Sequence, residues 1–202
     1  ANLPAVTAAS VAAGGQGTVS IPLGNTGGSV LNWSVDNTGE AISRLVERWR
    51  GAVGSGFRAT RYTDPATAGL LAQFSGDDFV VDSATRLTGI SAEGFVVSGA
   101  ALATAAQSLQ WSIYPDAAGL PAGNPLTSAD AAVWTYSSAP NGAGVTLAGG
   151  RISIDLDAAG QAVTLPAGRY WVVINTTGTF ANRWAWFGSA DGQGGFAGIN
   201  IA

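Results

Sequence analysis

Three aspartates, Asp77, Asp78 and Asp82, form the densest group of acidic side chains in the sequence. Carboxylate oxygens, joined by loop carbonyls, are the ligands that Ca²⁺ takes in proteins, in sets of about six to eight. In a strand, however, successive side chains point to opposite faces, so Asp77 and Asp78 would diverge. Two interpretations follow: a structural calcium site, or else a turn at the entry of a strand or a hydrogen-bonded pair at the surface.

A second group of side chains, between residues 180 and 193, combines aromatic rings with polar groups. Rings can stack on the apolar face of a sugar, while amide, guanidinium and carboxylate groups bind its hydroxyls. Period-two geometry also puts the two tryptophans on one face of a strand, where they would fill a core equally well. The segment predicts either a ligand platform, with a carbohydrate as the ligand, or part of the core. The candidate contact residues are Asn182, Arg183, Trp184, Trp186 and Asp191.

The composition excludes most reaction chemistry before any fold is considered. The chain has no Cys, no His and no Met, which excludes Ser-His-Asp and Cys-His catalysis, thiolate and imidazole metal sites, and disulfides. A glycosidase would need two carboxylates across a cleft. Glu93 with Asp77 or Asp78 is a candidate pair, but no motif in the sequence supports it. We therefore expect no enzyme activity, and no cofactor beyond the calcium ion considered above.

The charge balance argues against a nucleic-acid partner. Nine basic residues, all arginine, stand against 13 acidic ones, for a net charge of −4, and phosphate binding depends on clustered basic residues. No apolar run approaches the roughly 20 residues of a membrane span, and we expect any signal segment to be removed before Ala1. The lack of Cys, the few charges and the many small residues favour a protein that is secreted or held at the cell surface of a bacterium.

One helical pattern stands near the N-terminus, at residues 38–51. Apolar side chains recur there at helical spacing, Thr38 is placed to cap the helix, and glycines follow it. The sequence thus divides into an extended N-terminal strand arm (1–37), a short helix with a Gly-rich linker (38–56) and a β-sandwich domain (57–202). Two or three strands cannot bury a core alone, so the arm must dock on the following domain or on another molecule.

From residue 57 onward the pattern is one of short strands between turns rich in Gly, Pro, Asn and Asp. The run from Tyr170 to Ile174 is apolar on both faces, which indicates a core strand that is covered on both sides. Together the pattern predicts an all-β fold, an antiparallel jelly-roll-like β-sandwich with one short N-terminal helix. The expected strands are 74–81, 85–92, 95–97, 108–114, 132–136, 151–156, 162–165, 170–175 and 183–188.

Several phrases of the sequence resemble a known class of domain. The first phrases are residues 77–81, 88–90 and 111–121, and the later ones are 165–171 and 184–186. Together, over about residues 74–190, they resemble the non-catalytic β-sandwich accessory modules in the C-terminal regions of secreted bacterial subtilisin-like proteases and other exported multidomain proteins. The resemblance implies export and an accessory role, and it brings no set of functional residues with it.

We therefore expect a non-catalytic extracellular binding or accessory module that contacts a glycan or a protein at the cell surface. The alternative is a structural subunit of an extracellular filament or surface layer, a homopolymer assembled by strand addition through the N-terminal arm.

Overall fold

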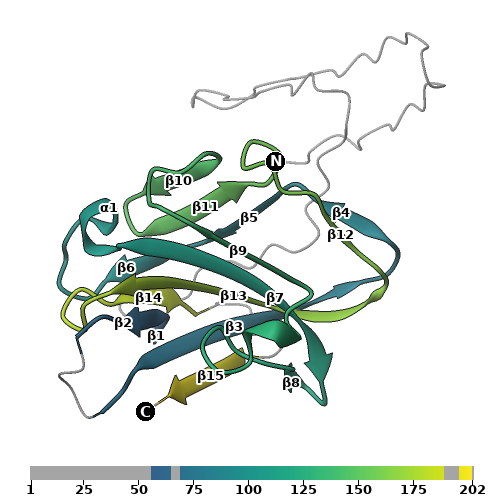
Figure 1. Ribbon diagram of the computed structural model, residues 1–202, viewed down its shortest axis with the longest axis horizontal. Helices are drawn as coiled ribbons and strands as arrows, with labels where there is room; N and C mark the ends of the chain where they lie inside the picture. The colour runs from purple at the N-terminus through teal and green to yellow at the C-terminus, as the bar shows by residue number, and fades with distance from the viewer. Residues whose placement is uncertain (1–55, 65–68, 189–195, 202) are drawn as a thin grey trace, which may run out of the picture. The chain divides into compact units, whose positions relative to one another are not determined.

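The computed structural model describes residues 56–64, 69–188 and 196–201, and these form an all-β fold (Figure 1). The predicted fold class is thereby confirmed, whereas the jelly-roll connectivity stays a prediction. The expected N-terminal arm and the helix at 38–51 lie outside the described residues, as does the strand addition attributed to the arm. The helical turns of the described part are α1 (Leu102–Ala105) and the 3₁₀ turn η1 (Ala129–Ala131). No helix in that part is long and apolar enough to cross a membrane.

The largest sheet has seven strands and supplies one wall of the core. Its middle is β13 (Gly168–Gly178), which pairs antiparallel with β3 (Ala72–Val81) on one side and with β7 (Ser108–Ala117) on the other. The outer strands of this sheet are β15 (Phe196–Ile201) beside β3, and β8 (Leu120–Pro121) and β9 (Trp134–Ser138) beside β7.

A short strand, β2 (Thr60–Tyr62), is inserted between β3 and β13 where these two strands diverge. The direct pairing of β3 with β13 ends at Gly76 and Val173. Beyond that point β2 pairs antiparallel with β3 and parallel with β13, an exception to the expected antiparallel arrangement. The insertion carries Tyr62 to the same end of the sheet as Gly178.

Residues 85–96 connect the three smaller sheets. They run as β4 (Thr85–Leu87), β5 (Gly89–Ala92) and β6 (Gly94–Val96), one strand in each sheet. The partners are β12 (Val163–Leu165) for β4, β11 (Arg151–Asp155) with β10 (Val145–Ala148) for β5, and β14 (Trp184–Phe187) with β1 (Gly56–Arg58) for β6.

The chain passes from β1 to β2, and so from a small sheet into the large one, through the single residue Ala59. The Ala59 amide donates to the carbonyl of Trp184 (3.0 Å), and its carbonyl accepts from the amide of Thr176 (3.0 Å). Ala59 is completely buried. One residue therefore ties the two layers together through its backbone.

The main core lies between the large sheet and the smaller sheets. Alternation along β7 places Leu109, Trp111 and Ile113 on this inner face, and all three are fully buried. The smaller sheets contribute, among others, Ile152 and Trp184.

A second, smaller core covers the opposite face of the large sheet. Trp171 and Val173 of β13 lie there with Tyr114 of β7, and they are covered by the segment that contains Leu126. The strand from Tyr170 to Ile174 is therefore covered on both faces, as its sequence predicts.

Candidate ligand-binding surface

Asp78, one of the three candidate calcium ligands, is held by an arginine. Its side chain points to the second core and is almost buried, with the residue 5% exposed. Arg169 donates to the Asp78 Oδ2 atom from Nε (2.8 Å), and its Nη2 lies 2.7 Å from the same oxygen. Both guanidinium nitrogens thus contact one carboxylate oxygen, and the ion pair is also a charge-assisted hydrogen bond.

Asp116 extends the same group. Its Oδ1 atom accepts a hydrogen bond from Trp171 Nε1 (2.7 Å), and its Oδ2 atom accepts one from the Gly119 amide (3.0 Å). These bonds, the Trp171 bond above all, hold the pKa of Asp116 below its ordinary value, and Arg169 adds to the effect. We call Asp78, Asp116, Arg169 and Trp171 the Arg169 clasp. It fastens β3, β13 and the end of β7 on one face of the large sheet.

The other two candidate calcium ligands are not brought to Asp78. Asp77 stands opposite Val172 in the register and Asp78 opposite Trp171, so they point to opposite faces, as alternation predicts. Asp82 is exposed beyond the end of β3. Among the described residues, no group of three acidic side chains is placed to hold a metal ion. Asp78 is hydrogen-bonded to Arg169, but it is nearly buried and so is not the surface pair considered from the sequence.

The two candidate tryptophans pack against each other, with ring centroids 6.5 Å apart, and differ in exposure. Trp184 is 0% exposed, and its Nε1 atom donates to the Gly150 carbonyl (2.8 Å). Trp186 is half-buried against the core. A Cβ atom at Gly94 would lie 2.6 Å from the Trp184 ring, so only glycine fits beside it. The Trp184 ring is a core filler, and a ligand platform at this place would have to be formed by other rings.

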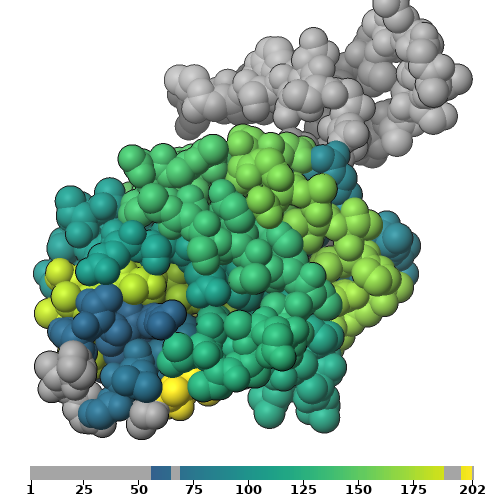
Figure 2. Space-filling model, in the orientation of Figure 1, coloured from purple at the N-terminus to yellow at the C-terminus, as the bar shows by residue number. Residues whose placement is uncertain are grey.

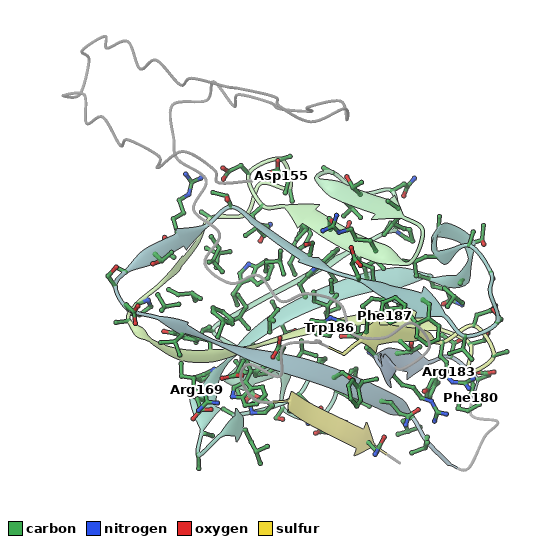
Figure 3. The ribbon with its side chains drawn as sticks, turned by 180° about the vertical axis from the view of Figure 1, so that it is seen from behind. Asp155, Arg169, Phe180, Arg183, Trp186 and Phe187 are labelled. Carbon is green, nitrogen blue, oxygen red and sulfur yellow. The ribbon has the colours of Figure 1, made fainter. Side chains whose placement is uncertain are left out.

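Arg183 lies beside Phe180 at the surface (Figure 3), and Asn182, which precedes it in the chain, is half-buried. The guanidinium carbon of Arg183 lies 4.2 Å from the centre of the Phe180 ring, and Nη1 donates to the Phe180 carbonyl (2.7 Å). The Nε atom of Arg183 is buried and has no hydrogen-bond partner. Asn182 accepts a hydrogen bond from Ser98 (2.8 Å). The fifth candidate, Asp191, lies outside the described residues.

Tyr62 continues this surface from β2. Its ring and that of Phe180 form a T-shaped pair, with centroids 5.2 Å apart and planes at 62°. Its hydroxyl donates to Gln73 Oε1 (2.6 Å), and Gln73 Nε2 donates in turn to Asn200 Oδ1 (2.8 Å). Arg58 Nη1 also donates to Gln73 Oε1, at 3.3 Å. We call this row the Tyr62 surface: Arg58, Tyr62, Gln73, Phe180, Arg183 and Asn200.

The hydroxyl of Tyr62 stays protonated over the physiological range. Partial burial raises its pKa above the ordinary value of 10.0, Asp64 raises it further, and the charges of Arg58 and Arg183 act in the opposite direction. Asp64 itself accepts a hydrogen bond from the Phe180 amide (2.7 Å). A neutral hydroxyl both donates and accepts, so Tyr62 can bind a second polar partner while it donates to Gln73.

The Tyr62 surface is assembled from segments far apart in the sequence. The β1 and β2 strands, drawn in blue, border on the yellow-green residues near 180 (Figures 1 and 2). Sequence reasoning identified Arg183 and missed Tyr62, Gln73 and Asn200. The segment that contains Tyr62 was not recognised as a strand, although the aromatic side chain two positions after Thr60 is typical of one.

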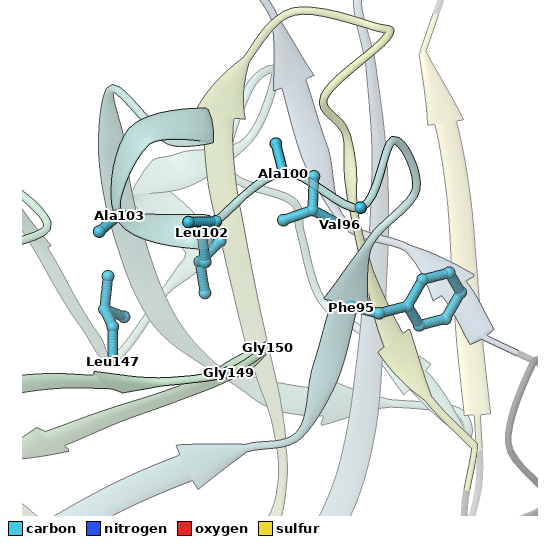
Figure 4. A pocket seen from close by; sticks show the side chains of 10 residues that line it. Phe95, Val96, Ala100, Leu102, Ala103, Leu147, Gly149 and Gly150 are labelled. Atoms are coloured by element: carbon cyan, nitrogen blue, oxygen red, sulfur yellow. The ribbon is translucent and has the colours of Figure 1, made fainter.

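A pocket of about 420 Å³ lies elsewhere, between α1, β6 and the turn that joins β10 to β11 (Figure 4). Its walls include Phe95, Val96, Leu102 and Leu147, and the other lining residues are alanines and glycines. None of the lining residues has a polar side chain. The pocket can hold an apolar group, but its side chains cannot orient a ligand by hydrogen bonds.

Comparison of the chain with protein-family models, with curated proteins and with solved structures gave no match.

Proposed function

We propose that this domain is a non-catalytic binding module that contacts a glycan through the Tyr62 surface. The observation that carries the proposal is the row itself: two aromatic rings, two amides and two guanidinium groups lie together at the surface. Sugars offer apolar faces for rings and hydroxyls that need both donors and acceptors, and the row supplies both kinds of partner.

The positions of the acidic side chains support a non-catalytic role. A glycosidase needs one carboxylate as acid and another as base or nucleophile, separated by about 5 to 9.5 Å across a substrate cleft. Of the pair considered from the sequence, Asp78 binds Arg169, whereas Glu93 faces Arg151 at 3.9 Å in the neighbourhood of β11. Each of these carboxylates already has a cationic neighbour in its own part of the fold.

The cellular setting belongs to the same proposal. A glycan-binding module with this composition suits a protein that is secreted or held at the surface of a bacterium, acting as an accessory to catalytic or adhesive domains. The accessory role rests on the sequence resemblance described above, and the glycan contact rests on the Tyr62 surface.

Binding of the purified chain to a glycan array tests the proposal directly. We expect binding to at least one glycan, and a roughly tenfold loss, about 1.4 kcal/mol, for Tyr62→Ala and for Phe180→Ala. The matched control is Phe57→Ala, since Phe57 is 44% exposed, lies on β1 and is not part of the row. Circular dichroism melts identify any variant that loses its fold.

Two results would overturn the proposal. One is an array on which the folded chain binds no glycan. The other is binding that survives in both ring variants as well as in the control, because the contact would then lie elsewhere on the molecule.

A further inference from the structure

The six arginines of the described residues divide into two groups. Three of them form ion pairs with carboxylates: Arg86 with Asp157, Arg151 with Glu93, and Arg169 with Asp78. The other three, Arg58, Arg61 and Arg183, have no carboxylate within ion-pair distance among the described residues. Half of the described arginines are thus without a carboxylate partner in a chain with a net charge of −4.

Two of the unpaired arginines lie near the Tyr62 side chain, because Arg58 donates to the same Gln73 oxygen as the Tyr62 hydroxyl and Arg183 lies over the Phe180 ring that packs on Tyr62. Both Arg58 and Arg183 are close enough to lower the pKa of Tyr62. Arg61 is adjacent to Tyr62 in β2 and therefore points to the other face of the strand. Within the described part of the chain, the acidic group that also acts on Tyr62 is Asp64, whose Oδ1 atom accepts a hydrogen bond from the Phe180 amide.

Most of the hydrogen-bonding capacity of these two guanidinium groups is unused within the described residues. A guanidinium group has five N–H donors. Arg183 uses one Nη1 bond to the Phe180 carbonyl, its Nε is buried without a partner, and Arg58 has one long bond of 3.3 Å to Gln73. The remaining N–H donors of both groups are therefore left for an acceptor on a ligand.

We propose that the Tyr62 surface selects acidic sugars, and that the carboxylate of a uronic-acid residue lies between Arg58 and Arg183. This inference rests on the proposed glycan-binding function. Guanidinium groups match a carboxylate with two parallel hydrogen bonds, while the Tyr62 and Phe180 rings take the sugar face. Two cations at one site suit a single charged group, whereas a nucleic acid would need several basic contacts along its backbone.

Isothermal titration with oligomers of galacturonate, glucuronate and mannuronate tests the inference, with the carboxyl-reduced form of each oligomer as a neutral counterpart. We expect at least one acidic oligomer to bind at least tenfold more tightly than its reduced form. The affinity should fall as NaCl is raised, because exposed charges are screened.

Substitutions then locate the selectivity. Arg58→Ala and Arg183→Ala should each weaken the acidic oligomer about tenfold and leave the reduced form nearly unchanged. Arg183→Lys should fall between, because lysine keeps the charge and loses the two-pronged geometry. Arg151→Ala is the control, since Arg151 lies on β11 and its side chain is 51% exposed.

The outcomes separate this inference from the proposed function. Equal affinity for acidic and reduced oligomers, or selectivity that persists in both alanine variants, overturns the inference while glycan binding stands. Absence of binding to every acidic oligomer, with array binding to neutral glycans through Tyr62, also overturns it and leaves the proposed function intact. Absence of any glycan binding removes both.

Discussion

Arg169 and Arg183 are the same residue type at two ends of one domain, and the fold uses them in opposite ways (Figure 3). Arg169 binds the buried carboxylate of Asp78 and lies 3.8 Å from Asp116. Arg183 has no carboxylate partner among the described residues and lies on the face of Phe180. The first arginine neutralises a charge that the fold has buried, while the second keeps its charge available at the surface.

The difference teaches where to look for function in a protein that lacks the usual catalytic residues. A charge that is paired with an opposite charge inside the molecule contributes to stability, so its removal should lower the free energy of unfolding. A charge left without a partner contributes little to stability, so its removal should instead lower the affinity for a ligand. The following changes test this contrast, from the largest expected effect on stability to the smallest.

Arg169→Ala should cost the most, about 2 to 4 kcal/mol of unfolding free energy, because it leaves the nearly buried Asp78 carboxylate without its guanidinium partner. Urea denaturation measures this cost. Arg151→Ala is the matched control, and it should lose less than about 1 kcal/mol because its pair with Glu93 is exposed. Equal losses for the two variants would mean that Arg169 is no more than a surface charge.

Asp116→Asn should change the acid limb of the stability profile. The pKa of Asp116 is lower in the folded state, so its contribution is fully present above the unfolded pKa, about 3.9, and is lost as pH falls through the folded value. The variant should therefore lose less stability than the native chain between about pH 5 and the folded pKa. Urea midpoints at several pH values measure the effect, and parallel acid limbs would contradict it.

Arg183→Ala should lower the free energy of unfolding by less than about 1 kcal/mol, the typical value of an exposed contact between a cation and an aromatic ring. If the variant unfolds as readily as Arg169→Ala, the contrast between the two arginines is broken, and Arg183 is a structural residue.

Tyr62→Phe should have the smallest effect near neutral pH, about 0.5 kcal/mol, because the hydrogen bond to Gln73 that it loses is partly exposed. Its signature lies at alkaline pH. The pKa of Tyr62 is raised in the folded state, so its contribution is present below the unfolded value of 10.0 and is lost as pH rises through the folded one. The free energy of unfolding of the variant should therefore fall less steeply at alkaline pH than that of the native chain. An identical dependence on pH would contradict a raised pKa of Tyr62.

Local patterns of apolar and polar residues were sufficient to predict several of the strands. The core strand around Tyr170 and Ile174 is present as β13, and the expected strand 108–114 is present and longer as β7. The expected strand 85–92 is interrupted at Thr88, which separates β4 from β5 as they enter different sheets. That break depends on the partners of each half, which local alternation does not contain.

The candidate site was only partly accessible to sequence reasoning, for the same reason. Asn182 and Arg183 were found because they stand beside aromatic residues in one segment. Tyr62, Gln73 and Asn200 are joined by the pairing of β2, β3 and β15, which depends on long-range register. Trp184 was ambiguous from the sequence, because the same alternation describes a ring that fills a core and a ring that faces a ligand.

The crossing at Ala59 has a consequence for communication within the domain. Its amide is fixed to the carbonyl of Trp184, and Tyr62 follows three positions later. If ligand contact displaced β2, the displacement would reach the backbone beside Trp184, one of three fully buried tryptophans, so we expect ligand binding to change the tryptophan fluorescence of the domain.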